Sequence, residues 1–600
     1  MKRSLLYYLV RLVQSFVIAM FLNLSFYLSM SPCIPFNQGV YKDFGVYQNG
    51  FYILLLIVFP LSLLPYGSIG LVLFSLFCSV VSFINFYELT FRGTVLVLND
   101  YKNLNTVNHV ISSYKFSLNA NVMVMIMSVV VTIGLCIVSD KIIPRKTQRS
   151  LLLTRIGVGV LDVIVLVYLL FSSSLIPTEN MWSWEEYYYR YGFVVGMAGN
   201  IKHGQVTVIE PDGYNRNSIR LIDSFPPTTR EYPDIIMILN ETYYDFTHLM
   251  EMDTDVDFME NFKKLECFKG YAAVPVVGGG TNDSEYELLT GNSISLLNTY
   301  SPFNNLSLSS SNSIAGYLKE LGYATMGAHS EVSSNYHRES SWEDLGLEQT
   351  WFDQAFEDLQ YDGNRPRATD SSVFKNFSRL YEGMPSDKPR FGFLITIQNH
   401  GGWSDNPSEF DRVHVLSGDR TDELEEYLTS MQMTDAFIQE LTEYFRGTDR
   451  KVIVCMVGDH APAFIPQFNS GTDDDYLRKR QVPYFIWSNY IDTNEMPLSR
   501  NVDLCALSPY AMYCGGLPIC PYHMNIINLS QTVQCFTNVT TPGEGEEYFG
   551  NTLGYVLSNG EIHSIDEDTE EGMLLRNYFY SEYNLLADRN KVKELTMTTK

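Results

Sequence analysis

A glycine-rich segment in the middle of the chain carries the residue with the clearest chemical potential. Residues 276–287 read VVGGGTNDSEYE, so Thr281 follows three glycines and precedes a stretch typical of a helix. Asn282 and Glu285 have the spacing of a capping box, which predicts that the helix begins here. A hydroxyl at a helix N-terminus, beside free backbone N–H groups, can meet a phosphate or another tetrahedral anion. The alternative is a common glycine-rich turn whose threonine only caps a helix.

Four short apolar segments each lead directly into an ionisable or metal-binding side chain. The segments are residues 235–239, 323–328, 391–397 and 452–457, and the side chains that follow them are Glu241, His329, His400, Asp459 and His460. Short apolar runs separated by helical stretches predict an α/β domain with a largely parallel sheet. Such sheets bind ligands at the carboxyl ends of their strands. One histidine after a strand is usually structural, but four such coincidences together with Thr281 predict a polar catalytic site.

Glu241, Asp459 and His460 supply two carboxylates and one imidazole. This mixed oxygen and nitrogen set suits Mn²⁺, Mg²⁺ or Zn²⁺. If Thr281 is the fourth ligand, the metal would lower the pKa of its hydroxyl and turn a poor nucleophile into an alkoxide. The alternative for the Asp459-His460 pair is a strand-end turn with a hydrogen-bonded aspartate.

The residues after His329 add groups that could hold a substrate. Residues 329–338 read HSEVSSNYHR. Within them, Arg338 could bind phosphate oxygens in a bidentate manner, and Tyr336 could stack on a small polyol. His400 would suit a general acid or base that acts on a leaving or attacking alcohol. A solvated surface loop is the alternative for residues 329–338.

The N-terminal part of the chain holds the long apolar runs. Residues 5–29, 51–89, 122–138 and 151–176 are each long enough to span a bilayer. The second run contains Pro60, Pro65 and Gly67, which predicts a tight hairpin of two spans. We therefore expect a transmembrane domain of five helices at residues 1–177, a juxtamembrane helix and linker at 178–232, and a catalytic domain at 233–600.

Positive charge sets the expected orientation of these spans. Basic residues lie at the N-terminus and before the last span: Lys2, Arg3, Arg11, Lys141, Arg145, Lys146 and Arg149. Both places are cytoplasmic if there are five spans, which puts everything after about Pro177 outside the cell. A cleaved signal peptide is the rival interpretation of residues 1–30, but that apolar region is too long and lacks a clear small-residue cleavage site. The net charge of −26 then belongs mainly to an extracellular acidic domain, which argues against a nucleic-acid partner.

Several of the nine cysteines fall in the part expected outside the cell, where disulfides are permitted. Cys505, Cys514, Cys520 and Cys535 could form one or two bridges, but the sequence does not fix their pairing.

Together these residues give the chain a resemblance to the lipoteichoic acid synthase family. Members are membrane-anchored phosphoglycerol transferases with a sulfatase-like or alkaline-phosphatase-like extracellular domain, and the resemblance covers nearly the whole chain. It implies five membrane helices and an α/β domain with a mainly parallel central sheet and helices on both faces. It also implies that Glu241, Thr281, Asp459 and His460 bind one metal ion, Mn²⁺ or Mg²⁺ rather than Zn²⁺, and that Thr281 is the nucleophile. The residues expected around the glycerol phosphate are His329, Glu331, Tyr336, Arg338 and His400.

Two positions depart from the best-known members of that family. They carry an aspartate where Glu331 stands and a tryptophan where Tyr336 stands, so the head group and the acceptor are open. The sulfatase nucleophile motif Cys/Ser-x-Pro-x-Arg is missing, which argues against sulfate ester hydrolysis.

The resemblance implies a metal-dependent transfer of glycerol phosphate in two steps. Thr281 takes the group from phosphatidylglycerol as a covalent intermediate, and a glycolipid or polyglycerolphosphate acceptor then receives it, with His400 carrying protons. Lipoteichoic acid synthesis or a related envelope modification is the expected role. The alternatives are a phosphoethanolamine transferase, and a non-catalytic binding or sensor protein on a sulfatase-like scaffold.

Overall fold

The chain forms two compact units, Met1–Gln205 and Val206–Lys600, and each is described by itself. The computed structural model describes residues 2–31, 44–64, 66–91, 95–96, 119–143, 152–172, 176, 187–188, 191–203, 208–297, 302–306, 308–309, 313–333, 335–363, 365–403, 407–469, 475–539 and 553–597. The boundary between the units falls inside the predicted linker segment 178–232. Pro65, Pro177 and most of residues 178–190 lie outside the described residues.

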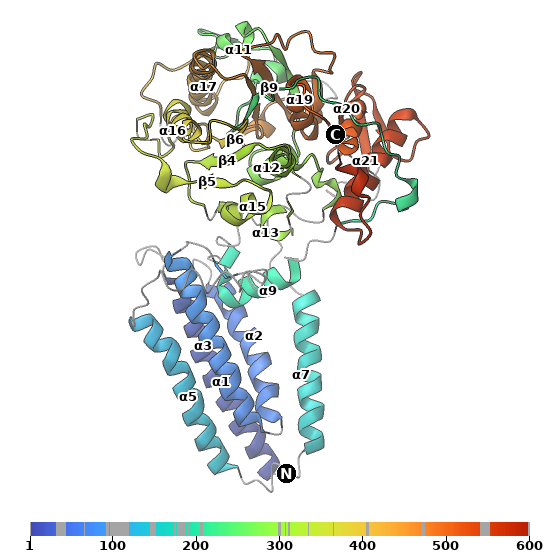
Figure 1. Ribbon diagram of the computed structural model, residues 1–600. Coiled ribbons are helices and arrows are strands. Elements are labelled where there is room, and N and C mark those ends of the chain that lie inside the picture. The colour runs from blue at the N-terminus through green and yellow to red at the C-terminus, as the bar shows by residue number, and fades with distance from the viewer. Residues whose placement is uncertain are drawn as a thin grey trace. The chain divides into compact units, whose positions relative to one another are not determined.

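Long apolar helices dominate the first unit (Figure 1). They are α1 (Lys2–Ser29), α2 (Phe44–Leu63), α3 (Gly67–Phe91), α5 (Ala120–Ile142) and α7 (Leu152–Ser172). Four stretches are long and apolar enough to cross a membrane: Leu5–Ser29, Gly67–Tyr87, Ala120–Ile142 and Leu152–Leu169. Asn49–Leu63 is a shorter apolar helix. The expectation of an N-terminal helical membrane domain is therefore confirmed as four or five apolar helices.

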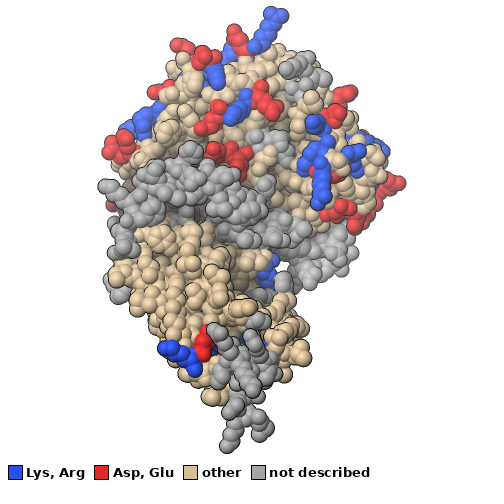
Figure 2. All heavy atoms as spheres, turned by 60° about the horizontal axis from the view of Figure 1, so that its bottom comes forward, with Lys and Arg blue, Asp and Glu red and all other residues tan. Residues whose placement is uncertain are grey.

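The surface of these helices suits a lipid environment. Side chains such as Leu153, which is 85% exposed, point away from the unit. Figure 2 shows few charged side chains on the visible face of this unit. The turn between α2 and α3 is tight, because a Cβ at Gly67 would lie 2.6 Å from the carbonyl oxygen of Leu61. The prediction was a hairpin of two spans; of its two helices, α3 is long enough to span a membrane and α2 holds the shorter apolar stretch Asn49–Leu63.

An eight-stranded sheet organises the second unit, in the order β10-β3-β9-β8-β1-β6-β4-β5. Its strands are β1 (Asp234–Asn240), β3 (Phe268–Ala273), β4 (Ala324–His329), β5 (Gln349–Trp351), β6 (Arg390–Ile395), β8 (Val452–Gly458), β9 (Gln481–Ser488) and β10 (Asn501–Asp503). Neighbours pair in parallel, except that β9 runs antiparallel to both β8 and β3. The central strands are buried along their whole length, as their continuous apolar sequences require. The predicted mainly parallel sheet is confirmed.

Helices cover both faces of this sheet (Figure 1). Successive residues of a strand point to opposite faces, which identifies the cover on each side. Ile236 of β1 shares its face with Phe377 of α16 (Asp370–Glu382), since both flank Gly392. The next residue, Met237, meets Ser508 of α19 (Leu507–Cys514), whose Oγ is 3.5 Å from the methionine sulfur. The predicted layering with helices on both faces is therefore confirmed.

The cysteines in this unit do not form the predicted bridges. Cys505, Cys514, Cys520 and Cys535 are all free and buried. They pack inside the core as small apolar side chains.

Candidate active site

Neighbouring strands bring the predicted residues to one edge of the sheet. Leu239 at the end of β1 and His329 at the end of β4 both pair with Ile395 at the end of β6. Strand β8 ends beside β1, where Gly458 pairs with Asn240. The side chains at or after these strand ends are Glu241, His329, His400, Asp459 and His460.

Thr281 begins α12 (Thr281–Thr290) and faces this edge. Its Oγ1 donates a hydrogen bond of 2.7 Å to Oδ2 of Asp459, and the residue is 9% exposed. Gly280 before it has φ of 91°, and Gly278 has φ of 77°. A Cβ at Gly278 would lie 2.8 Å from the Cα of Ala463. The glycines therefore let the backbone pass close to the segment after β8 and bring the hydroxyl onto the carboxylate.

The predicted capping box at Asn282 and Glu285 is wrong. Gly280 is the N-cap of α12 and makes no side-chain capping bond. Instead, Oδ1 of Asn282 accepts the backbone N–H of Phe303 at 3.2 Å, and Glu285 forms an ion pair with Arg338. Asn282 and Glu285 therefore bind partners that are distant in sequence and do not cap the helix.

Glu241, Asp459 and His460 form a compact, buried group whose ligand atoms all lie within 4.8 Å of one another. His460 Nε2 is 3.3 Å from Oδ2 of Asp459 and 3.9 Å from Oε1 of Glu241. His460 Nδ1 lies 2.9 Å from the carbonyl oxygen of Ala461, which places the ring proton on Nδ1. The lone pair of Nε2 therefore faces the carboxylates, as in a metal-binding histidine.

The electrostatics of this group fit a divalent cation. Burial and the charge of Asp459 raise the pKa of Glu241 well above its ordinary value. Oδ1 of Asp459 accepts the backbone N–H groups of Thr242 at 2.7 Å and of His460 at 2.8 Å, which hold the carboxylate in place. Two buried carboxylates, an imidazole and the Thr281 hydroxyl form a donor set that suits Mn²⁺, Mg²⁺ or Zn²⁺.

His329 and His400 lie at the same edge but differ in exposure. His329 is 2% exposed, and its Nδ1 is 3.1 Å from the carbonyl oxygen of Ile395. Burial and the charge of Arg338 lower its pKa well below the ordinary value. The side chain of His400 reaches solvent, yet the protein packed around its ring and the charge of Arg367 lower its pKa as well. Both imidazoles are neutral at neutral pH and can accept a proton.

Arg338 is held in a fixed position beside the strand ends. Its Nε lies 2.9 Å from Oε2 of the fully buried Glu285, whose other oxygen accepts the indole N–H of Trp342. The guanidinium carbon sits 4.9 Å from the centre of the Tyr336 ring. Its charge lowers the pKa values of Glu241 and Glu285 against the effect of burial. The predicted substrate residues Tyr336 and Arg338 thus form one unit, while Glu331 pairs with a different arginine.

Glu331 pairs with Arg367, a residue that the sequence analysis missed. Nη1 of Arg367 is 3.4 Å from Oε2 of Glu331, and its buried Nε has no hydrogen-bond partner among the described residues. The charge of Arg367 lowers the pKa values of Glu241, His329 and His400, so the guanidinium is close enough to act on all three. Arg367 precedes α16 and follows no strand, which is why the strand-end pattern did not reveal it.

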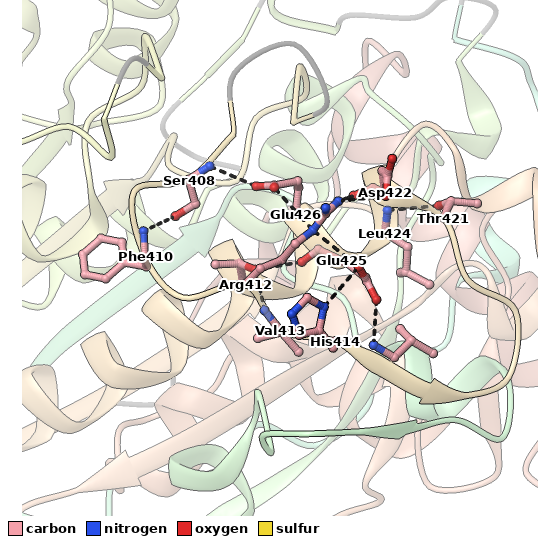
Figure 3. Close-up of polar contacts among 12 residues, drawn as sticks. Ser408, Phe410, Arg412, Val413, His414, Thr421, Asp422, Leu424, Glu425 and Glu426 are labelled. Atoms are coloured by element: carbon pink, nitrogen blue, oxygen red, sulfur yellow. Dashed lines mark hydrogen bonds and ion pairs between the residues drawn. The ribbon is translucent and has the colours of Figure 1, made fainter.

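A charged network holds the segment beyond His400 against α17 (Asp422–Arg446), as Figure 3 shows. The side chain of Glu425 is fully buried and lies 2.8 Å from Nε of Arg420 and 3.4 Å from Nε of Arg412. Glu425 also accepts the backbone N–H of Val415 at 3.0 Å. These contacts fix β7 (Val415–Ser417) and the residues before it.

Part of the chain that holds this site is similar to known proteins. Residues 233–504 match the Sulfatase family. A protein of Rhizobium meliloti (strain 1021), provisionally named a cyclic beta-1,2-glucan modification protein, is 26% identical over 330 residues, which are 52% of this chain and 50% of that protein. Lipoteichoic acid synthase 2 of Bacillus subtilis (strain 168) is 26% identical over 220 residues, 35% of this chain and 33% of that protein.

Among solved structures, the Streptococcus pyogenes phosphoglycerol transferase GacH in complex with sn-glycerol-1-phosphate is 17% identical. The match covers 63% of this chain and 95% of that chain, with a TM-score of 0.48. The chain spans half or less of the length of the two curated relatives named above. The family match and the relatives confirm the resemblance drawn from the motifs.

Proposed function

We propose that this chain, whose residues 233–504 form a sulfatase-family domain, is a phosphotransferase that moves glycerol phosphate from phosphatidylglycerol to a glycolipid or polyglycerolphosphate acceptor. One observation carries the proposal: the hydroxyl of Thr281 donates to Asp459 at 2.7 Å inside a buried set of metal-binding side chains. A threonine in this position lies beside a proton acceptor, Asp459, and at a helix N-terminus. Both features suit attack of its hydroxyl on phosphorus. The similarity to lipoteichoic acid synthase 2 favours glycerol phosphate as the group transferred.

The residues of the chain can perform the transfer in two steps. In the first, Thr281 gives up its proton, its Oγ1 bonds to phosphorus, the bond from phosphorus to the diacylglycerol oxygen breaks, and that oxygen takes up a proton. In the second, a hydroxyl of the acceptor gives up its proton and attacks phosphorus, the bond from phosphorus to Oγ1 breaks, and Thr281 takes up a proton again. His400 is neutral and reaches solvent, so it can take the proton of the attacking alcohol and pass it to water.

The metal would be held by Glu241, Thr281, Asp459 and His460. When bound there, Mn²⁺ or Mg²⁺ would lower the pKa of the Thr281 hydroxyl and offset phosphate charge. Arg338 and Arg367 supply the positive charge that faces the anionic diester. His329, Glu331 and Tyr336 complete the surroundings of the head group.

A lipid donor explains the apolar helices of the first unit. The basic residues near the N-terminus and before α7 favour a cytoplasmic N-terminus with the catalytic domain outside the cell. We accordingly assign residues 1–177 to the membrane, 178–232 to a juxtamembrane helix and linker, and 233–600 to catalysis.

The test is to incubate the purified full chain in detergent with Mn²⁺ and phosphatidylglycerol labelled in its head group. We expect diacylglycerol release and a labelled protein whose adduct maps to Thr281 by mass spectrometry. Thr281→Ala should abolish both, while Glu241→Gln should abolish them through loss of a metal ligand. Chelation should stop the reaction, and added Mn²⁺ should restore it.

If the Thr281→Ala variant still releases diacylglycerol, Thr281 is not the nucleophile. An adduct formed only from phosphatidylethanolamine would identify the chain as a phosphoethanolamine transferase. A chain that binds no metal and forms no adduct would be a non-catalytic binding protein.

A further inference from the structure

Glu285 is a fully buried acidic side chain that takes no part in the two steps of the transfer. It lies four residues after Thr281 in α12, so the two side chains are neighbours on the same side of that helix. It does not cap α12, since Gly280 is the N-cap and makes no side-chain capping bond. The partners of its carboxylate lie instead in α15 (Arg338–Asp344).

The carboxylate of Glu285 joins two successive turns of α15. Its Oε2 lies 2.9 Å from Nε of Arg338, and its Oε1 accepts the indole N–H of Trp342. Arg338 and Trp342 are four residues apart, so they lie on one side of α15. Both oxygens of the carboxylate are therefore used, and the bond to the guanidinium is of the strong, charge-assisted kind.

Trp342 is in turn anchored in the core beside the sheet. The indole is fully buried and lies 5.0 Å from the ring of Phe352 and 5.7 Å from that of Phe393 in β6, measured between ring centres. The neighbouring strand β4 has a glycine where the indole needs room, because a Cβ at Gly327 would lie 2.7 Å from the Trp342 ring. Glu285 thereby ties Arg338 to the sheet whose strand ends carry the site.

The backbone directly before Arg338 is strained. Tyr336 has φ of 58° and His337 has φ of 53°, in the left-handed region that bulky side chains rarely adopt. Such a conformation persists only where the surrounding contacts impose it. The ion pair of Arg338 with Glu285 follows immediately, and the guanidinium carbon lies 4.9 Å from the centre of the Tyr336 ring. The pair is thus one of the contacts that hold this turn against the site.

The pairing leaves one edge of the Arg338 guanidinium open. Among the described residues, only its Nε takes part in a hydrogen bond or an ion pair. Nη1 and Nη2 can therefore donate two parallel hydrogen bonds to phosphate oxygens. Because Thr281 and Glu285 belong to the same helix, the carboxylate also fixes this edge relative to the Thr281 hydroxyl.

We propose that Glu285 is a positioning residue, which holds the open edge of Arg338 at a fixed distance from Oγ1 of Thr281. It touches no substrate and carries no proton in the reaction. Its effect on the transfer passes through Arg338. The inference rests on the proposed function, since it takes a phosphate ester as the ligand of Arg338.

The experiment makes two measurements on the purified full chain in detergent with Mn²⁺. They are the affinity for glycerol phosphate, by titration calorimetry, and kcat/KM for diacylglycerol release from phosphatidylglycerol. Glu285→Gln keeps the shape of the side chain but removes its charge and one acceptor oxygen. We expect it to weaken binding and to lower kcat/KM, each about 10- to 100-fold, because a small misplacement of a binding group is costly.

Two further variants separate a positioning role from a general effect on the fold. Adding Glu285→Gln to Arg338→Gln should cause no further loss of affinity or kcat/KM, because Glu285 acts through Arg338. The double variant should also melt higher than Arg338→Gln, in which a buried carboxylate has lost its cation. Glu287→Gln is the matched control. It alters another buried glutamate of α12, whose partners are Ile294 and Thr537, and should leave affinity and kcat/KM unchanged.

Unchanged affinity and kcat/KM in Glu285→Gln would overturn the inference. A further loss in the double variant would overturn it too, because Glu285 would then act by another route. If Arg338→Gln does not fold, the control decides: an equal loss in Glu287→Gln would mean general damage to α12. A wild type that binds glycerol phosphate but releases no diacylglycerol would refute the proposed function, and the binding measurements would still decide the role of Glu285.

Discussion

At the scale of single residues, Arg367 is a second cation placed to meet an incoming anion. Arg338 is paired with the fully buried Glu285 at 2.9 Å, whereas Arg367 forms a longer pair of 3.4 Å with Glu331, and its Nε is buried without a hydrogen-bond partner among the described residues. Arg367→Gln should therefore lower kcat/KM for phosphatidylglycerol about 10- to 100-fold, the effect of losing a charged hydrogen bond of about 1.5–3 kcal/mol. Steady-state kinetics of diacylglycerol release would measure it.

The same substitution makes a prediction about pH. Burial and then Arg367 lower the pKa of His400, so removing the positive charge should raise that pKa. If neutral His400 is the base, the acid limb of the pH–rate profile should move to higher pH in Arg367→Gln. Arg379→Gln, on the exposed face of α16, should change neither the rate nor the profile. An unchanged pH–rate profile in Arg367→Gln would show that Arg367 does not lower the pKa of the catalytic base.

At the scale of elements, the network around Glu425 fixes β7 against α17. Burial acts to raise the pKa of Glu425, but Val415 N–H, His414, Arg420 and Arg412 outweigh it, so the net pKa is lowered. Glu425→Gln should reduce the free energy of unfolding by about 1–3 kcal/mol at neutral pH, because it leaves buried donors and charges without their partner.

The pH dependence of that loss has a definite sign. A carboxyl whose pKa is lowered by folding contributes stability above its unfolded pKa of about 4.3, and the contribution disappears as pH falls through the folded pKa. The difference in melting temperature between wild type and Glu425→Gln should thus shrink below about pH 4. Glu440→Gln, at an exposed position of the same helix, should show no such difference. A difference that persists at low pH would assign the effect of Glu425 to packing.

Features that lie within one continuous segment of the chain could be predicted from the sequence. Each strand and the residue after it are contiguous, so apolar runs predicted the sheet and the side chains at its edge. The capping box failed because Glu285 pairs with Arg338, 53 positions away. Arg367 reaches the site from a segment before a helix, and the four cysteines pack as free thiols in the core. Such pairings depend on the tertiary fold and leave no local pattern.

At the scale of the whole molecule, the two units have separate cores. The largest buried cluster consists of residues between Ile235 and Leu595, and another holds residues of the N-terminal apolar helices, such as Ile18 and Leu71. Unit Val206–Lys600 should therefore fold without the helices, since its core contains no residue from them.

This separation predicts how the activity divides between the units. The fragment 206–600 should turn over a short-chain, water-soluble glycerophosphodiester at a rate within about threefold of the full chain, because every proposed catalytic group lies inside it. On phosphatidylglycerol in vesicles it should lose most of its activity, since the effective concentration provided by the membrane anchor is gone. Parallel assays of both proteins on both substrates, with Thr281→Ala as the blank, would measure this. Equal activity on vesicles would show that the helices serve another purpose than bringing the enzyme to its lipid.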